Sequence, residues 1–288
     1  MANIRISTDS TCDLPRELIE KYNIHVCPMH VNLGDKTYDD DGTQLNPQMM
    51  FDYVKQTGQL PKTAAISMGE YIDMFSALTA DGSEVVHIGF SSDLSVSFHN
   101  AELAAEELER VYTVNTKNLS TGMALLILRA CELVEEGKTA QEIVDIITEM
   151  VPCVDASFVI DSLENLHKGG RCSAVAKLGA NLLKLKPCIT VKEGKMGVDK
   201  KYRGAIQTVL PEYARDRLVD LDDVDLSRVF VTHTFGDERE PVLATIEEVK
   251  KIAPFAELIE NQAGCTISTH CGPRTLGVLF IRKSPIVK

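Results

Sequence analysis

Hydroxyl groups cluster where an apolar run gives way to a helical pattern, within residues 87–101. Ser91 and Ser92 follow the run Val85-Val-His-Ile88, which is typical of a buried strand. The first N–H groups of a helix have no internal partners and the helix dipole favours negative charge, so such a junction can hold an anionic oxygen. Capping of the helix by one of these serines is the alternative use of the same hydroxyls.

Further polar residues could complete such a site, namely Asp9-Ser10, Thr63, Lys168-Gly-Gly-Arg171, Arg203 and His270. Together they suit either acyl chemistry, with a serine nucleophile and a histidine base, or the binding of a carboxylate or phosphate without bond cleavage. The sequence has no Gly-x-Ser-x-Gly motif, which argues against a hydrolase, and no glycine-rich nucleotide-binding loop. A structural histidine at 270 and a surface arginine at 171 are the competing interpretations.

The elements that must position these residues differ between the two halves of the chain. Residues 1–150 alternate strand and helix patterns, which predicts a parallel sheet with helices on both faces and ligands at the carboxyl ends of its strands. Asp9-Ser10 and Ser91-Ser92 both follow predicted strands, as this arrangement requires. Residues 156–288 mix strands with helices, one of them expected from Ser173, and indicate an α+β region.

Local signals add detail to this prediction. Ser67-Met-Gly-Glu70 and Thr139-Ala-Gln-Glu142 are capping boxes, so Ser67 is expected to begin a helix rather than bind a ligand. A hairpin is expected between residues 187–191 and 196–203, around a Glu-Gly-Lys turn. The acidic stretch Tyr38-Asp-Asp-Asp-Gly42 lacks the rest of a calcium-binding loop and is expected to be a solvated turn.

Composition and charge argue against several classes of protein. The chain has 288 residues, enough for two domains, and its net charge of −12 argues against a nucleic-acid partner, because binding to phosphates needs basic surface. No apolar stretch is long enough to span a bilayer and no signal peptide is evident, so a cytoplasmic protein is expected. The eight cysteines are scattered without a Cys-x-x-Cys pair, so free thiols and no metal site are expected.

The order of the polar motifs resembles that of the DegV family of bacterial fatty-acid-binding proteins. The matching segments are Asp9-Ser-Thr-Cys-Asp-Leu-Pro15, Pro61-Lys-Thr-Ala-Ala-Ile-Ser67, Ser91-Ser-Asp-Leu-Ser95, Leu163-Glu-Asn-Leu-His-Lys-Gly-Gly-Arg171, Lys186-Pro187, Lys201-Tyr-Arg203 and His270-Cys-Gly-Pro273. Each motif is short, but their order and spacing cover nearly the whole chain.

The resemblance implies two domains with a long-chain fatty acid buried between them. An N-terminal parallel-sheet α/β domain would cover residues 1–155 and a C-terminal α+β domain residues 156–288, with residues 45–75 packing against the second domain.

The resemblance also implies which residues bind the ligand. Thr63, Ser92 with Ser91 beside it, and His270 would hold the fatty-acid carboxylate. Arg203 would be a further partner of the head group, and Arg171 would lie near the opening.

The family's role implies a lipid-binding carrier subunit without turnover or cofactor of its own. A partner, the catalytic subunit of a fatty acid kinase, would phosphorylate the exposed carboxyl, and the acyl phosphate would feed phospholipid synthesis. Transient membrane contact is compatible with this role, whereas nucleic acid is not an expected partner. The alternatives are a serine acyl hydrolase that uses Ser92 and His270, and a DNA-binding regulator.

The sequence departs from the family's pattern at Ala64-Ala65-Ile66, Val96, Asn115 and Arg274. These departures leave the implied carboxylate ligands in place. They bear instead on the preferred acyl chain and on the kinase contact.

Overall fold

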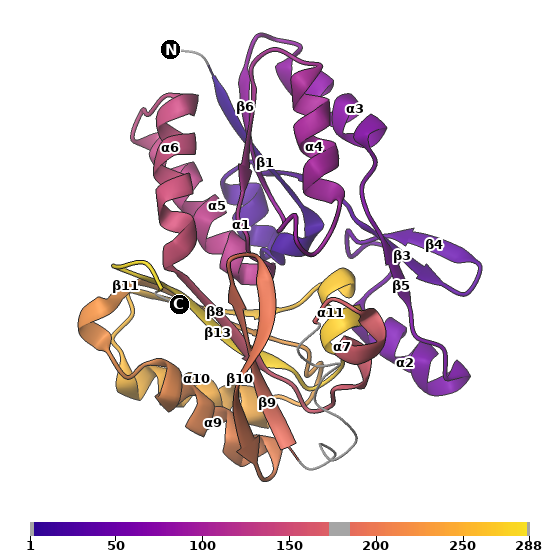
Figure 1. Cartoon of the computed structure of the whole chain (residues 1–288), viewed down its shortest axis with the longest axis vertical. Coiled ribbons are helices and arrows are strands. Elements are labelled where there is room, and N and C mark those ends of the chain that lie inside the picture. Colours follow the sequence, from indigo (N-terminus) through magenta and orange to yellow (C-terminus); the bar gives the residue numbers. More distant parts are fainter. Residues whose placement is uncertain (1–2, 173–184, 287–288) are drawn as a thin grey trace.

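The computed structural model describes residues 3–172 and 185–286. Within these ranges the strands form three sheets, of four, three and six strands. The four-stranded sheet and its helices form the upper part of Figure 1, and the six-stranded sheet forms the lower part. The helix predicted from Ser173 lies outside the described residues. None of the helices in these ranges combines the length and apolar character that a bilayer crossing requires.

The four-stranded sheet is entirely parallel, with the strand order β2-β1-β6-β7. Its strands are β1 (Ile4–Asp9), β2 (His25–Cys27), β6 (Glu84–Gly89) and β7 (Val111–Asn115). The predicted parallel sheet in the first half of the chain is therefore confirmed. Because the strands are parallel, all four carboxyl ends lie along one edge of the sheet.

Helices cover both faces of this sheet, as the alternating pattern predicts (Figure 1). They are α1 (Arg16–Lys21), α3 (Met68–Thr79), α4 (Ser97–Glu106), α5 (Ser120–Glu135) and α6 (Ala140–Met150). Val85 packs with α3 and α4, whereas Val86 and Ile88 pack with the other helices. Both predicted capping boxes are present, at Ser67 and Thr139.

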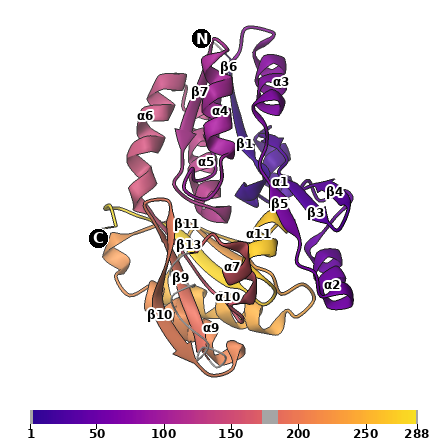
Figure 2. The ribbon, with the colours of Figure 1, turned by 45° about the vertical axis from the view of Figure 1, so that its right-hand side comes forward.

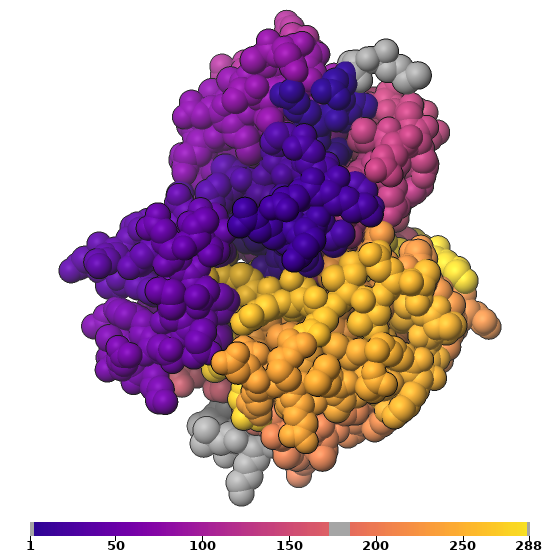
Figure 3. Space-filling view, turned by 180° about the vertical axis from the view of Figure 1, so that it is seen from behind, coloured from indigo at the N-terminus to yellow at the C-terminus, as the bar shows by residue number. Residues whose placement is uncertain are grey.

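A small antiparallel sheet, β4-β3-β5, projects beside α2 (Pro47–Thr57). Its strands are β3 (His30–Leu33), β4 (Lys36–Asp39) and β5 (Lys62–Ala64). Figure 3 shows this purple unit lying against the yellow C-terminal part of the chain. The prediction of a solvated turn at residues 38–42 is wrong, because Tyr38 lies in β4 and Asp40 is buried, with 7% of its surface exposed.

The six-stranded sheet has mixed strand directions and the order β10-β9-β8-β13-β11-β12. Its strands are β8 (Val154–Val159), β9 (Leu185–Lys192), β10 (Lys195–Arg203), β11 (Val224–His233), β12 (Glu257–Gln262) and β13 (Leu276–Arg282). The predicted hairpin is confirmed as β9 and β10, which pair in antiparallel register.

Helices also cover both faces of the six-stranded sheet. α9 (Ile206–Arg217) and α10 (Glu240–Ile252) pack on the outer face. α7 (Glu164–Gly169) and α11 (Cys265–Cys271) lie on the inner face, between the two large sheets (Figure 2). This places α11, which carries His270, at the junction of the two halves.

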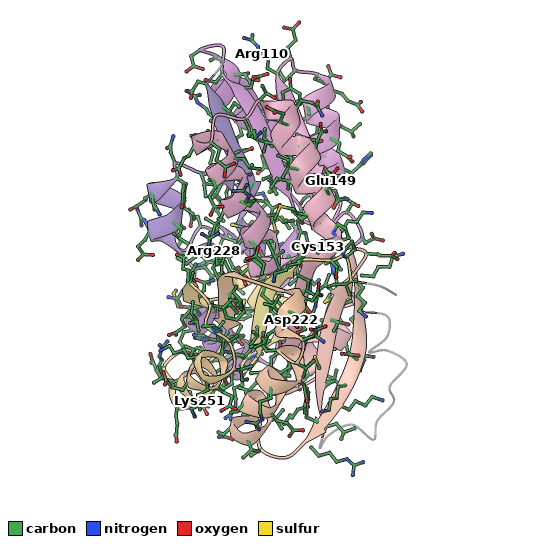
Figure 4. The ribbon with its side chains drawn as sticks, turned by 90° about the vertical axis from the view of Figure 1, so that its left-hand side faces the viewer. Arg110, Glu149, Cys153, Asp222, Arg228 and Lys251 are labelled. Carbon is green, nitrogen blue, oxygen red and sulfur yellow. The ribbon has the colours of Figure 1, made fainter. Side chains whose placement is uncertain are left out.

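An ion pair ties the two halves of the chain together on the side shown in Figure 4. Arg228 of β11 contacts Glu132 of α5, with 3.0 Å between Nη2 and Oε1, and Glu257 of β12, with 2.5 Å between Nε and Oε2. The chain passes from α6 to β8 at Cys153, which is labelled in the same view. The two halves of the chain are thus joined by the segment between α6 and β8 and by the ion pair between Arg228 and Glu132.

His87 is a fully buried histidine of β6. Its Nδ1 is hydrogen-bonded to Ser7 Oγ at 3.1 Å, and its ring packs edge-on against Tyr71 and Phe75. Burial lowers the pKa of His87 from 6.5 to about 3. Between these two pH values the unfolded chain binds a proton that the folded chain excludes, so His87 makes the fold less stable as the pH falls.

Replacing His87 with phenylalanine is expected to remove this acid sensitivity, because phenylalanine keeps a ring in place but cannot be protonated. Between pH 7.5 and 4.5 the wild-type protein should lose about 2–3 kcal/mol of unfolding free energy relative to His87→Phe. Urea unfolding at both pH values measures this difference. His99→Gln, which changes an exposed histidine, is the control. An equal acid loss in wild type and His87→Phe would contradict the prediction.

Candidate functional site

A cavity of about 450 Å³ lies where the two large sheets face each other. Phe90 and Leu119, which follow β6 and β7, form part of its wall, and Phe158 of β8 and Leu279 of β13 form part of the opposite wall. The carboxyl ends of the parallel strands therefore border the cavity, as the rule for such sheets predicts. Its size falls within the range of about 300–1,000 Å³ that is typical of small-molecule sites.

Thr63 and His270 meet at this cavity although they are 207 residues apart. Thr63 lies on β5 of the small sheet, and His270 lies near the end of α11. Thr63 Oγ1 and His270 Nε2 are hydrogen-bonded at 3.0 Å. The structure thus brings together two of the residues that the sequence analysis assigns to one site.

His270 is held in its neutral form. Burial and, as the smaller cause, the positive charge of Arg171 together lower the pKa of His270 from 6.5 to about 4. Near neutral pH the imidazole and the threonine hydroxyl are therefore uncharged hydrogen-bonding groups. An acidic ligand would gain its hydrogen bonds from them and its charge complement from Arg171.

Ser92 lines the cavity, whereas Ser91 does not belong to the described lining. The Ser92 hydroxyl accepts a hydrogen bond of 2.7 Å from Asn115 Nδ2. Ser91 is buried, and its hydroxyl donates to the carbonyl oxygen of Gly194 at 3.0 Å, in the turn between β9 and β10. The two adjacent serines therefore have different roles, since Ser92 faces the cavity and Ser91 attaches the β9–β10 hairpin to the loop after β6.

Separate alanine substitutions should distinguish the two serines. Ser92→Ala is expected to weaken ligand binding about 3- to 10-fold and leave stability unchanged, because it removes one hydroxyl from the cavity wall. Ser91→Ala is expected to lower the free energy of unfolding by about 1 kcal/mol, because Gly194 loses a buried donor. Titration with a long-chain fatty acid, the ligand that the family resemblance implies, and urea unfolding of both variants measure these effects. The same pattern in both variants would contradict the assignment.

The two arginines that the sequence analysis assigns to the site occupy different places. Arg171 lines the cavity, and its Nη1 donates to the carbonyl oxygen of Gly169 at 2.7 Å. Arg203 is exposed at the end of β10 and lies outside the described lining of the cavity. The structure therefore brings Arg171 to the site and leaves Arg203 at the surface.

The other serines of the stretch after β6 have structural roles. The N-cap residue of α4 is Val96, which offers no side-chain oxygen. Ser95 Oγ instead accepts from the backbone N–H of Ser97 at 3.2 Å, and Ser97 Oγ accepts from the N–H of Ile66 at 3.1 Å. The interpretation that one of these serines, Ser95 in particular, is the N-cap of this helix is therefore wrong, because the chain enters the helix one residue later, at Val96.

Asp13, which the sequence analysis did not assign to the site, links the two halves beside it. Its Oδ2 accepts from Ser120 Oγ at 2.5 Å and its Oδ1 accepts from the N–H of Gly264 at 2.8 Å, just before α11. Burial raises the pKa of Asp13 to about 8, although both hydrogen bonds favour the ionised form. A carboxylate at this place satisfies a helix N–H group that has no partner within the helix.

Asp40 binds the same helix terminus from the small sheet. It accepts hydrogen bonds from the N–H groups of Cys265 at 2.9 Å and Thr266 at 2.8 Å. Burial raises the pKa of Asp40 as well. With Asp13, this side chain fixes the start of α11 and therefore the position of His270 at its other end. Only the three successive aspartates of residues 39–41 gave a signal for it in the sequence.

At this cavity Ser92 and His270 are not hydrogen-bonded to each other as a nucleophile and its base would be. His270 Nε2 is hydrogen-bonded to Thr63, and the Ser92 hydroxyl is hydrogen-bonded to the amide of Asn115. A serine nucleophile needs a base within hydrogen-bonding reach of its hydroxyl. Among the described residues, no group of histidine, cysteine or acidic side chains is arranged to hold a metal ion.

The positions that depart from the family pattern lie partly at the cavity. Ala65 and Val96 line it, and Val96 is 63% exposed. Arg274 instead forms ion pairs with Asp161 at 3.4 Å and Glu238 at 3.2 Å. The first two departures can therefore alter ligand contacts, whereas Arg274 is engaged in the second half.

Comparison with protein families gives one match that spans almost the whole chain. Residues 3–283 match a family model described as "Uncharacterised protein, DegV family". A DegV domain-containing protein of Clostridium acetobutylicum is 33% identical over 285 residues, which covers 98% of this chain and 100% of that protein.

Solved structures of similar fold include proteins described as binding fatty acids. A DegV family protein from Thermus thermophilus, described for its fatty acid binding, has a TM-score of 0.87 and 28% identity, with 97% of this chain and 99% of that chain covered. DegV of Bacillus subtilis, described as a fatty acid binding protein, has a TM-score of 0.84 and 28% identity, with 98% and 100% covered.

Proposed function

Because the chain belongs to the DegV family, we propose that it binds a long-chain fatty acid in the cavity between its two large sheets. The observation that carries this proposal is the pairing of Thr63 with His270 at the wall of a largely apolar cavity of about 450 Å³. Such a cavity suits a ligand with one acidic end and a long apolar body. The fatty-acid binding described for the similar proteins adds support.

The apolar wall supplies the driving force for binding. Transfer of about fifteen methylene groups from water is worth on the order of 12 kcal/mol at about 0.8 kcal/mol each. Loss of translational freedom and ordering of the chain offset much of this gain. The polar groups then need only satisfy the carboxylate, since an unpaired buried carboxylate would cost several kcal/mol.

We propose that the carboxylate lies beside Thr63, Ser92 and His270, with Arg171 at the opening. Three of these residues offer uncharged hydrogen-bonding groups, and Arg171 is the one lysine or arginine in the described lining of the cavity. For Arg203 and Ser91 a role in ligand binding is supported by the family resemblance alone, because neither residue belongs to the described lining of the cavity. This arrangement favours binding over cleavage, because His270 is bonded to Thr63 rather than to a serine nucleophile.

Identification of lipid bound to the purified protein tests this proposal. Native mass spectrometry should detect a fatty acid of long chain, and solvent extraction should release it from the folded protein. A protein that carries no fatty acid and binds none on addition would contradict the proposal. Labelling of Ser92 by a fluorophosphonate probe, lost in Ser92→Ala, would favour a hydrolase instead.

The carrier role is a further part of the proposal. The family resemblance supports a protein without turnover of its own that presents the fatty acid to the catalytic subunit of a fatty acid kinase in the cytoplasm, for phospholipid synthesis. Transient contact with a membrane is compatible with this role. Phosphorylation of the bound fatty acid by a purified kinase subunit, in the presence of this protein and not in its absence, is the expected result.

We also propose that the chain divides into two domains near residue 155. The change of sheet at β8 supports this boundary. Residues 45–75 are proposed to pack with the second domain, and the hydrogen bond of 3.1 Å from Thr269 Oγ1 to Met50 Sδ supports that assignment.

A further inference from the structure

Gly169, the last residue of α7, touches the imidazole of His270. A Cβ atom built on Gly169 would lie 2.4 Å from Nδ1 and 3.3 Å from Cε1 of that ring. Real Cβ atoms do not approach neighbours as closely as 2.4 Å, so any larger residue here requires the ring or α7 to move. The imidazole therefore lies directly against the backbone of α7.

The two nitrogens of this imidazole have opposite surroundings. Nε2 is hydrogen-bonded at 3.0 Å to the Oγ1 atom of Thr63, a residue that also lines the cavity. Nδ1 is buried and has no hydrogen-bond partner in the part of the chain that the structure describes. Because Gly169 covers Nδ1, the ring can exchange hydrogen bonds with a ligand only through Nε2.

Other contacts hold α7 in this place. Asn165 Nδ2 donates to the carbonyl oxygen of Thr269 at 3.1 Å, which ties α7 to α11. Arg171 Nη1 donates to the carbonyl oxygen of Gly169 itself. The turn Lys168-Gly-Gly-Arg171 thus contacts the neutral histidine of the proposed carboxylate site and also carries its charged arginine.

We propose that Gly169 is a positioning residue of this site, whose missing side chain lets His270 direct Nε2 toward Thr63 and the ligand. The proposal rests on the proposed fatty-acid function and adds a role for the Gly-Gly pair. Gly169 itself touches no ligand in this account. It acts through the orientation of the imidazole.

A double-mutant cycle on ligand affinity tests the proposal. Gly169→Ala is expected to weaken fatty-acid binding about 10-fold or more in the wild-type background, because the added methyl group displaces the ring. In a His270→Gln background the same change should cost less than about 2-fold, because glutamine keeps an amide near the place of Nε2 and has no atom at the place of Nδ1. Equal costs in both backgrounds would overturn the proposal, since coupled residues must be non-additive.

A second measurement does not depend on the ligand. An NMR titration of the His270 ring should give a pKa near 4 in the wild type and a value closer to the ordinary 6.5 in Gly169→Ala, as the ring becomes more exposed. Gly69→Ala is the matched control, because Gly69 lies in α3 and its added methyl group would have only an ordinary contact with Ser67.

These measurements separate the two proposals. A wild-type protein that binds no fatty acid would refute the proposed function, while the titration would still decide the role of Gly169. If the single variant Gly169→Ala does not fold, the double variant Gly169→Ala/His270→Gln should fold, because the added methyl group no longer clashes with an imidazole ring. Failure of both to fold, or an unchanged titration in Gly169→Ala, would overturn the proposal.

Discussion

Simultaneous replacement of Thr63 and His270 by alanine is expected to weaken fatty-acid binding by about 100- to 1,000-fold. In the proposed site each side chain would give the carboxylate a hydrogen bond worth roughly 1–3 kcal/mol, and tenfold in affinity corresponds to about 1.4 kcal/mol. The loss should not be additive, because the two side chains are bonded to each other at 3.0 Å. Isothermal titration or displacement of a fluorescent fatty acid measures the affinities.

Conservative variants serve as controls for this prediction. Thr63→Ser keeps the hydroxyl and His270→Gln keeps a polar group near the position of Nε2, so both should retain most of the affinity. The double alanine variant should remain folded, because both residues lie at the cavity rather than in the packed core. Wild-type affinity in the double alanine variant would mean that the carboxylate lies elsewhere.

Replacement of Asp13 by alanine is expected to lower the free energy of unfolding by about 3–5 kcal/mol. The change leaves Ser120 Oγ and the N–H of Gly264 without their buried acceptor, at about 1–3 kcal/mol each. It also puts alanine at a φ of 51°, where an L-residue other than glycine, asparagine or aspartate is strained. Urea unfolding at pH 4, where the contribution of Asp13 to stability is nearly complete, measures the loss.

The variant Asp13→Asn tests whether the ionisable carboxyl group of Asp13, rather than its acceptor oxygen and backbone conformation, affects stability. Asparagine tolerates the left-handed conformation and keeps an acceptor oxygen, so this variant should lose less stability than Asp13→Ala. The pKa of Asp13 is raised from 3.8 to about 8 in the fold, so its contribution is complete below pH 3.8 and is lost as the pH rises toward 8. Relative to wild type, Asp13→Asn should therefore be more stable at pH 9 than at pH 5. A constant difference between the two proteins would contradict the raised pKa.

Much of the framework followed from local patterns in the sequence. The parallel sheet, both capping boxes and the β9–β10 hairpin are all marked by apolar periodicity, caps or turn residues within a few positions. Two helices had no such signal. α9 contains Pro211 in its interior, which ordinarily interrupts a helix, and α11 has only seven residues, mostly polar.

The site itself depended on contacts that no local pattern encodes. Asp40 lies in an acidic run that ordinarily faces water, yet its partners lie 225 and 226 positions later in the chain. Thr63 and His270 were named by the resemblance to a known family, whereas the residues alone favoured a structural role for the histidine at 270. The separation of Ser91 from Ser92 likewise required the position of Gly194, which the sequence could not place.

The shared cavity wall has a consequence for how long the protein survives in a cell. A fatty acid that contacts both halves binds the folded chain and not the unfolded one, so it stabilises the fold by mass action. At a free concentration one hundred times its dissociation constant, a ligand adds about 2.7 kcal/mol, which lowers the unfolded population about 100-fold. Proteases act on that population. The cellular abundance of this protein would then rise and fall with the concentration of free fatty acid. When fatty acid is scarce, the protein would be degraded faster.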